Sequence, residues 1–117
     1  MPDSRPVAPD LLAVAQEYLE QEVSPLLPPL QQFQLRIVKR VLDTVRRELE
    51  LGPAANAAEA QRLRALLRHD GSLTDLQAEL ATAIQHGDFA VDDPALLAHL
   101  RSTIEDALRI NNPKWLG

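Results

Sequence analysis

Residues 30–51 read LQQFQLRIVKRVLDTVRRELEL, and this stretch decides the fold class. Its apolar residues recur every three or four positions, which is the spacing of one face of an α-helix rather than of a strand. The stripe consists of Leu35, Val38, Val41, Leu42, Val45 and Leu49. Gly52-Pro53 follows directly, and this pair is typical of a helix end because proline cannot continue the helix. We therefore predict the longest helix from about Leu30 to Leu51.

The stretch in front of it predicts a first helix and a stiff connector. Apolar residues from Leu11 to Val23 repeat at three and four positions, Asp10 stands where an N-cap is expected, and Pro25 ends the pattern. Prolines are frequent in residues 24–29, and each removes a backbone donor and pushes the residue before it toward extended geometry. We therefore expect that this connector is not continuous helix.

Three shorter helices are predicted behind Gly52-Pro53, each from apolar residues at helical spacing. The first extends from about Ala57 to Arg68, and Gly71 is the residue expected to adopt a positive φ after it. The remaining caps and end signals are Ser72 and Gly87 for the second helix, and Asp93-Pro94 and Asn111-Asn112-Pro113 for the third.

No segment alternates apolar and polar residues over the length of a strand. The fold class is therefore predicted to be all-α. At 117 residues the chain has the size of one domain. We expect a single irregular bundle of about five helices over residues 1–117, with a proline-rich N-terminal arm at residues 1–9 and a C-terminal tail at residues 111–117.

Composition limits the function classes. The chain has no cysteine, which excludes thiol nucleophiles and thiolate-bound metal. Its net charge of −5 at pH 7 is unlike that of a protein that neutralises many phosphates. The N-terminal residues lack the pattern of a secretory signal, and no apolar run approaches the length of about 18 residues that a membrane span needs. We expect a cytoplasmic protein whose partners include neither nucleic acid nor membrane.

The side chains that commonly carry catalysis or hold cofactors form no motif. His69, His86 and His99 have no second metal ligand three or four residues away. We expect His69 and His86 to lie at helix ends, where a cation suits the dipole, and His99 to lie at the edge of the core. The four glycines are isolated, so no phosphate-binding loop is predicted. We therefore expect no catalytic residue, no metal site and no cofactor in this chain.

Charge is distributed unevenly along the chain. Residues 36–68 hold eight basic and four acidic side chains, a net +4, whereas the rest of the chain is net −9. Four charged residues of this region form compensated pairs along the long helix, in which a basic residue lies three or four positions from an acidic one. Three arginines form a second line along the helix with fewer acidic residues beside them. The two groups are Lys39, Asp43, Arg46 and Glu50, and Arg36, Arg40 and Arg47. The arginine line is either a solvated face or a surface for an acidic partner or a phosphorylated ligand.

Several stretches of the chain together resemble one family of small bacterial proteins. They are Val41-Leu42-Asp43-Thr44-Val45-Arg46-Arg47-Glu48-Leu49-Glu50-Leu51-Gly52-Pro53, Ile84-Gln85-His86-Gly87, Leu97-Ala98-His99-Leu100-Arg101-Ser102-Thr103 and Ile110-Asn111-Asn112-Pro113-Lys114. The family is a domain of unknown function, found beside aminoglycoside-phosphotransferase-like kinases and acyl-CoA dehydrogenases, and the resemblance covers nearly the whole chain. Where the family commonly ends in an Asn-Pro-basic-Tyr pattern, this chain has Trp115, which keeps the aromatic ring without the tyrosine hydroxyl.

The chain also resembles the small accessory subunit of the 4-hydroxyacyl-CoA kinase of bacterial levulinate catabolism, which supports a larger kinase subunit in phosphorylating the 4-hydroxyl of an acyl-CoA. The resemblance implies a non-catalytic subunit of a phosphotransferase-fold kinase that acts on hydroxyacyl-CoA in hydroxy or keto acid catabolism. It implies an aminoglycoside-phosphotransferase-like kinase as partner, which would hold ATP and magnesium, and contact with acyl-CoA through the complex. It supplies no catalytic residue.

We expect the partner to bind the arginine line and the C-terminal segment, because arginine and tryptophan are frequent interface anchors. The residues are Arg36, Arg40, Arg47, Asn112, Pro113, Lys114 and Trp115. Alternatives stay open. The arginines could be solvated only, and Trp115 could pack against the end of the bundle. The chain could also be a stand-alone helical interaction protein, such as a homo-oligomeric scaffold or regulator, and an enzyme in its own right is least expected.

Overall fold

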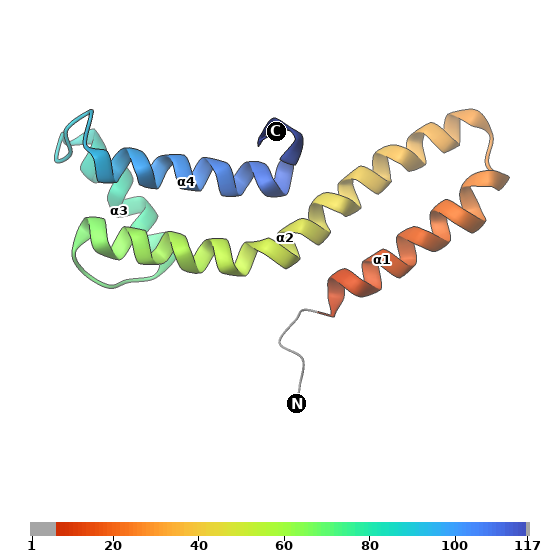
Figure 1. Cartoon of the computed structure of the whole chain (residues 1–117), viewed down its shortest axis with the longest axis horizontal. Coiled ribbons are helices and arrows are strands. Elements are labelled where there is room, and N and C mark those ends of the chain that lie inside the picture. Colours follow the sequence, from red (N-terminus) through yellow and green to blue (C-terminus); the bar gives the residue numbers. More distant parts are fainter. Residues whose placement is uncertain (1–6, 117) are drawn as a thin grey trace. The chain divides into compact units, whose positions relative to one another are not determined.

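The computed structural model describes residues 7–116 and contains no β-strand in that range, which confirms the all-α class (Figure 1). Its four α-helices are α1 (Ala8–Tyr18), α2 (Pro29–Leu67), α3 (Leu73–Gln85) and α4 (Pro94–Asn111). Shorter helical segments are the π-helical turn Leu19–Val23 and the 3-10 turns Ser24–Leu26 and Pro113–Leu116. Residues 1–6 of the predicted arm and Gly117 of the predicted tail lie outside the described residues.

The chain divides into two compact units, Met1–Gly52 and Pro53–Gly117, which we call unit 1 and unit 2. Because α2 runs through this boundary, its first part belongs to unit 1 and its second part to unit 2. The expectation that residues 1–117 form one domain stays a prediction.

The first helix begins earlier than the sequence predicts. α1 starts at Ala8, with Val7 as its N-cap and Pro9 in its first turn, so Asp10 is not the cap. Proline fits there because the first N–H groups of a helix have no intrahelical partner. Asp10 lies in the first turn, where its carboxylate faces the positive end of the helix dipole.

The connector between α1 and α2 breaks later than predicted. Pro25 does not end the helical path, because it occupies the first turn of the 3-10 segment Ser24–Leu26, where its missing N–H is not needed. The break comes at Leu27, which is extended with ψ of 148° in front of Pro28. The connector is therefore not continuous helix, as expected, and α2 begins at Pro29.

Gly52-Pro53 does not end a helix, and this corrects the predicted number of helices from about five to four. α2 continues through Pro53 to Leu67, so the helix predicted from about Ala57 to Arg68 is its second part. Pro53 removes one backbone hydrogen bond from the helix. Five of the seven residues in 54–60 are alanines, and alanine has the highest helix propensity, which keeps the chain helical behind the proline.

Unit 2 contains a leucine core to which α2, α3 and α4 each contribute. Its buried members are Leu63, Leu76, Leu80 and Leu96, and Leu67, Leu73 and Phe89 pack against them. Leu63 is 0% exposed and Leu76 is 1% exposed, so these two side chains lie at the centre of the core.

The residue that turns the chain after α2 is Arg68, so the prediction of a positive φ at Gly71 is wrong. Arg68 has φ of 64°, and its N–H donates to the carbonyl of Arg64 at 2.8 Å, which is a left-handed helix end. Glycine is present at position 71 for a different reason. An added Cβ there would lie 3.3 Å from Cδ2 of the buried Leu76, so a larger residue would press on the core.

The predicted ends of α3 and the start of α4 are confirmed. Ser72 Oγ accepts a hydrogen bond from the Asp75 N–H at 3.1 Å, and Asp93 Oδ1 accepts one from the Leu96 N–H at 3.0 Å. Each cap satisfies a backbone donor that has no partner within the helix. Gly87, with φ of 75°, closes α3 as the left-handed residue of a Schellman motif.

Candidate functional site

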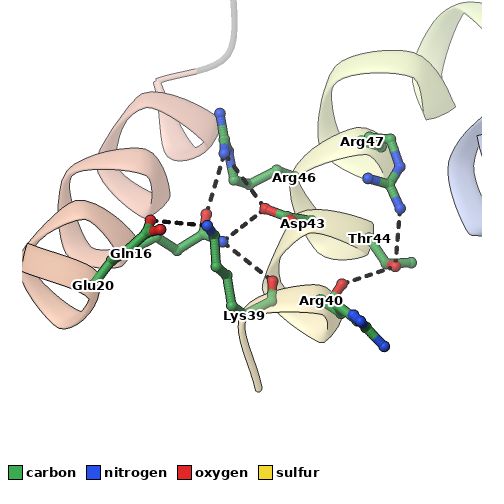
Figure 2. Close-up of polar contacts among 8 residues, drawn as sticks. All are labelled: Gln16, Glu20, Lys39, Arg40, Asp43, Thr44, Arg46 and Arg47. Atoms are coloured by element: carbon green, nitrogen blue, oxygen red, sulfur yellow. Dashed lines mark hydrogen bonds and ion pairs between the residues drawn. The ribbon is translucent and has the colours of Figure 1, made fainter. Parts of the chain in front are cut away.

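In unit 1, α1 and the first part of α2 meet along a seam that contains a polar network (Figure 2). Its centre is Gln16 of α1, which is 5% exposed. Gln16 Nε2 donates to Asp43 Oδ1 at 2.8 Å and to the Lys39 carbonyl at 3.3 Å, and Gln16 Oε1 accepts from Arg46 Nη1 at 3.3 Å. A buried amide must keep its partners, so the network favours one register of α1 against α2.

Two ion pairs accompany Gln16. Lys39 Nζ bonds Glu20 Oε2 at 2.8 Å, and Arg46 Nη1 lies 3.7 Å from Asp43 Oδ1. The hydrogen bond to the Glu20 carboxylate raises the pKa of Lys39. The prediction of compensated pairs along the long helix is confirmed for Asp43 and Arg46, whereas Lys39 pairs across the hairpin with α1.

The predicted arginine line lies on α2 in unit 1. The Arg36 guanidinium is 5.9 Å from the centre of the Phe33 ring. The Arg40 carbonyl accepts from Thr44 Oγ1 at 3.2 Å, and Thr44 Oγ1 accepts from Arg47 Nη2 at 3.2 Å (Figure 2). Among residues 7–116, neither Arg36 nor Arg40 forms an ion pair with another described side chain. Their charge can therefore attract an anionic partner.

The predicted C-terminal segment lies in unit 2, directly after α4. Asn112 is the C-cap of α4, and its carbonyl accepts from the Trp115 N–H at 3.1 Å. Pro113 and Lys114 are exposed, and Trp115 is 76% exposed. An indole with this exposure is not packed against a helix bundle. The arginine line and the C-terminal segment belong to different units.

Unit 2 contains a second polar cluster, in which Arg62 of α2 meets two residues of α4. Arg62 Nε donates to His99 Nδ1 at 3.0 Å, and Arg62 Nη2 donates to Thr103 Oγ1 at 3.2 Å. His99 is 4% exposed, so it lies inside the unit rather than at the edge of the core. Burial, followed by the charge of Arg62, lowers the pKa of His99. The ring is therefore neutral and carries its proton on Nε2.

The other two histidines lie at helix ends. His86 is the C-cap of α3, as predicted. His69 follows the end of α2, where its Nδ1 lies 2.8 Å from the Asp70 carbonyl and its Nε2 pairs with Glu79 Oε2 at 2.5 Å. The Asp70 carbonyl, followed by the Glu79 carboxylate, raises the pKa of His69. The arrangement stabilises the turn into α3 and needs no ligand.

An open hollow of about 500 Å³ is the candidate small-molecule site of unit 2. It is lined by Leu66, Leu67, Arg68, Glu79, Thr82, Ala83, Asp88, Phe89 and Asp93. Glu79 pairs with His69 and Asp93 caps α4, so two of its acids already have structural roles. The described part of the chain contains no group of three or more acidic or histidine side chains placed to hold a metal ion. No helix in it has the length and apolar composition required to cross a membrane.

Sequence reasoning missed Gln16 and Arg62 as members of buried polar clusters. A signal existed for Gln16, because it lies four residues after Leu12 and three before Leu19, on the apolar stripe of the first helix. A polar residue in such a position must find a partner when the stripe packs. Arg62 has no comparable signal, since its partner His99 is 37 residues away in the sequence.

Comparison with known proteins gives one family match. The model of a family described as a domain of unknown function, DUF6285, matches residues 25–115, which is more than half of the chain. The matched range contains the arginine line and the C-terminal segment through Trp115. No curated protein and no solved structure matches this chain significantly.

Proposed function

This chain belongs to the DUF6285 family, and on that premise we propose that it is a non-catalytic accessory subunit of an aminoglycoside-phosphotransferase-like kinase. The kinase phosphorylates the hydroxyl of a hydroxyacyl-CoA in the cytoplasmic breakdown of hydroxy or keto acids, and it holds ATP and magnesium. The resemblance of the sequence to the accessory subunit of 4-hydroxyacyl-CoA kinase supports this choice of partner.

The observation that supports a binding role is how little of unit 1 is buried. Among residues 7–52, only Pro9, Gln16 and Gly52 are buried. Apolar side chains such as Tyr18 and Val41 are 60% and 58% exposed. Monomeric proteins rarely leave large contiguous apolar surfaces in water. A surface of this kind is typical of a subunit that another protein covers.

We assign partner binding to the arginine line and the C-terminal segment. The planar guanidinium groups of Arg36, Arg40 and Arg47 suit carboxylates or the phosphates of CoA, because each can donate two parallel hydrogen bonds. Trp115 offers a large exposed ring with a polar N–H, a combination frequent among the residues that carry most of the affinity of an interface. Acyl-CoA then reaches this chain only through the complex.

The alternative function is that of a stand-alone interaction protein, such as a homo-oligomeric scaffold or regulator. The exposed apolar surface of unit 1 favours it equally, because a second copy can cover that surface as well as a kinase can. The two functions differ in whether a kinase is required, so capture of a kinase separates them.

The test is co-expression of the tagged chain with an aminoglycoside-phosphotransferase-like kinase. We expect the two proteins to purify together. Arg36→Glu and Trp115→Ala should each lower the affinity for the kinase about 10-fold or more without lowering the melting temperature. Arg101→Glu is the matched control, because Arg101 is an exposed arginine outside both proposed surfaces. Failure to capture the kinase would overturn the proposed function. Unchanged affinity in both variants would overturn the assignment of the binding surface to the arginine line and the C-terminal segment.

A further inference from the structure

The turn that joins α2 to α3 contains a histidine whose two ring nitrogens both have a partner. His69 Nδ1 lies 2.8 Å from the Asp70 carbonyl oxygen, and His69 Nε2 lies 2.5 Å from Glu79 Oε2. Asp70 belongs to the turn itself, whereas Glu79 belongs to α3. The imidazole ring of His69 therefore links the turn to the helix that follows it.

Both partners of the ring are hydrogen-bond acceptors. A backbone carbonyl can only accept, and an ionised carboxylate can only accept. A neutral imidazole has one N–H group and can satisfy one of them, whereas the imidazolium ion has two N–H groups and satisfies both. The geometry around His69 therefore requires the doubly protonated ring. The raised pKa of His69 has the same cause, with the Asp70 carbonyl as the largest contribution and the Glu79 carboxylate next.

The charged groups around His69 come from the turn, from α3 and from α2. Asp70 and Glu79 are the acidic groups that act on the ring. Arg64 of α2 acts on Asp70, because its Nε donates to Asp70 Oδ1 at 2.6 Å, and the same oxygen accepts from the Gly71 N–H at 2.8 Å. These two donors hold the Asp70 carboxylate on the α2 side of the turn. The bond between His69 and Glu79 is then the part of this network that ties the turn to α3.

We propose that His69 and Glu79 form a proton-dependent clasp on the α2–α3 turn, which is closed while the ring carries two protons and opens when the ring loses one of them to water. If the proton leaves Nε2, a lone pair faces the Glu79 carboxylate. If it leaves Nδ1, a lone pair faces the Asp70 carbonyl. Either way one hydrogen bond is replaced by a repulsive contact between two acceptors, so the neutral ring cannot keep both partners.

Opening of the clasp is a local event. The side chains of His69 and Glu79 are 48% and 46% exposed, so their pair is weaker than a buried one. The helix α3 stays attached to unit 2 through Leu76 and Leu80, which belong to the leucine core and do not titrate. Loss of the clasp therefore loosens residues 68–72 and leaves the rest of unit 2 folded.

The clasp lies at the wall of the open hollow of unit 2, because Glu79 also lines that hollow. The other charged residues of its lining are Arg68, Asp88 and Asp93. While the clasp is closed, the imidazolium ion compensates the Glu79 carboxylate. When it opens, the wall gains one uncompensated negative charge. Histidine is the side chain that ordinarily titrates near physiological pH, so the clasp makes the charge of the hollow depend on pH in that range.

The first test follows the full chain alone by nuclear magnetic resonance from about pH 5 to about pH 9, on both sides of the ordinary histidine range. It records the titration of the His69 ring and the backbone order of residues 68–72. We expect the order to fall as the pH rises, with the midpoint of the His69 titration. His69→Gln should remove this change. His86→Gln is the matched control, because His86 is an exposed histidine at the other end of α3 and its variant should keep the change.

The second test uses Glu79→Gln. A glutamine amide can accept from the protonated ring through its oxygen and donate to the neutral ring through its nitrogen, so it serves both states of His69. We expect this variant to lower the pKa of His69 toward its ordinary value and to keep residues 68–72 ordered at high pH. Circular dichroism checks that each variant is folded. Order that does not change with pH in the original chain, a change that persists in His69→Gln, or undiminished loosening in Glu79→Gln would each overturn the clasp. These outcomes do not depend on the kinase proposal, because no kinase is present.

Discussion

Arg68 adopts a left-handed backbone conformation, with φ of 64°, which glycine adopts with less strain than any other residue. We expect Arg68→Gly to raise the free energy of unfolding by about 1 kcal/mol, because the left-handed conformation costs a side-chain-bearing residue about that much. Urea denaturation measures the change. Arg101→Gly is the control, since Arg101 lies inside α4 and its change to glycine should lower the free energy of unfolding by about 1 kcal/mol. Equal losses in both variants would contradict the strain at Arg68.

His99 makes the stability of unit 2 depend on pH. Its pKa is lowered from the ordinary value of 6.5, so the unfolded chain binds a proton more readily than the folded chain does. The stabilisation by neutral His99 is therefore complete above the ordinary value and is lost as the pH falls below it toward the lowered value. His69 has a raised pKa and the opposite dependence, with its stabilisation lost as the pH rises through the raised value.

The contributions of the two histidines to the pH dependence are distinguished by comparing the original chain with the His99→Gln variant. Glutamine keeps an acceptor for Arg62 but does not titrate. We expect the free energy of unfolding of the original chain to fall more steeply between pH 7 and pH 5 than that of the variant, because only the original chain contains His99 with its lowered pKa. The contribution of His69 is the same in both proteins and cancels in the comparison. Urea denaturation at each pH provides the comparison. Identical pH dependence in the two proteins would show that protonation of His99 does not oppose folding.

Residue roles set by neighbours in the sequence could be predicted, and roles set by distant contacts could not. Ser72, Asp93 and Gly87 act within four residues of their own position, so these three helix ends could be predicted from the sequence. Gln16 bonds Asp43 across 27 positions, and Arg62 bonds His99 across 37. Such contacts depend on which helix faces pack together, and local patterns in a single sequence do not reveal that.

At the scale of secondary structure elements, the error over Gly52-Pro53 has a physical cause. The pair is a strong local stop signal, but its effect competes with the alanines behind it, and the summed helix propensity of the flanking residues keeps α2 continuous. Stop signals with no such competition, after α3 and after α4, were predicted correctly. The length of a helix therefore depends on the helix propensity of the whole segment and not only on its glycine and proline stop signals.

The continuity of α2 leads to a prediction for Pro53. Pro53→Ala should raise the free energy of unfolding by about 1–3 kcal/mol, because alanine restores one backbone hydrogen bond and removes the clash of the proline ring. Pro29→Ala is the matched control, since Pro29 is the first residue of α2 and its missing N–H has no intrahelical acceptor. Thermal denaturation followed by circular dichroism measures both. A less stable Pro53→Ala protein would show that the helix needs the proline at this position.

The packing of α3 on its neighbours in unit 2 depends on Leu76. Leu76→Ala should lower the free energy of unfolding by about 2–5 kcal/mol, because the cavity left in the leucine core cannot fully collapse. Ile104→Ala on α4 should change it by less than about 0.5 kcal/mol, because that side chain is 59% exposed. Urea denaturation distinguishes the two. Similar small effects would mean that the leucine core does not hold unit 2 together.

At the scale of the whole molecule, the two units differ in how they obtain stability. Unit 2 has its own leucine core, whereas the described part of unit 1 buries no large apolar side chain and relies on a polar seam. Unit 1 is therefore the part for which association brings the largest gain in apolar burial. This difference suits a protein that acts by binding. The sequence alone did not reveal it, because apolar residues at helical spacing occur in both units.

A phosphoryl-transfer assay tests the non-catalytic role most directly. Phosphorylation of a hydroxyacyl-CoA by ATP is measured for this chain alone, for an aminoglycoside-phosphotransferase-like kinase alone and for the two together. We expect no turnover by this chain alone and efficient turnover only when both proteins are present, because the proposed function places ATP and magnesium on the kinase and gives this chain a supporting role. Turnover by the isolated chain that persists after rigorous removal of contaminating kinases would contradict the proposal.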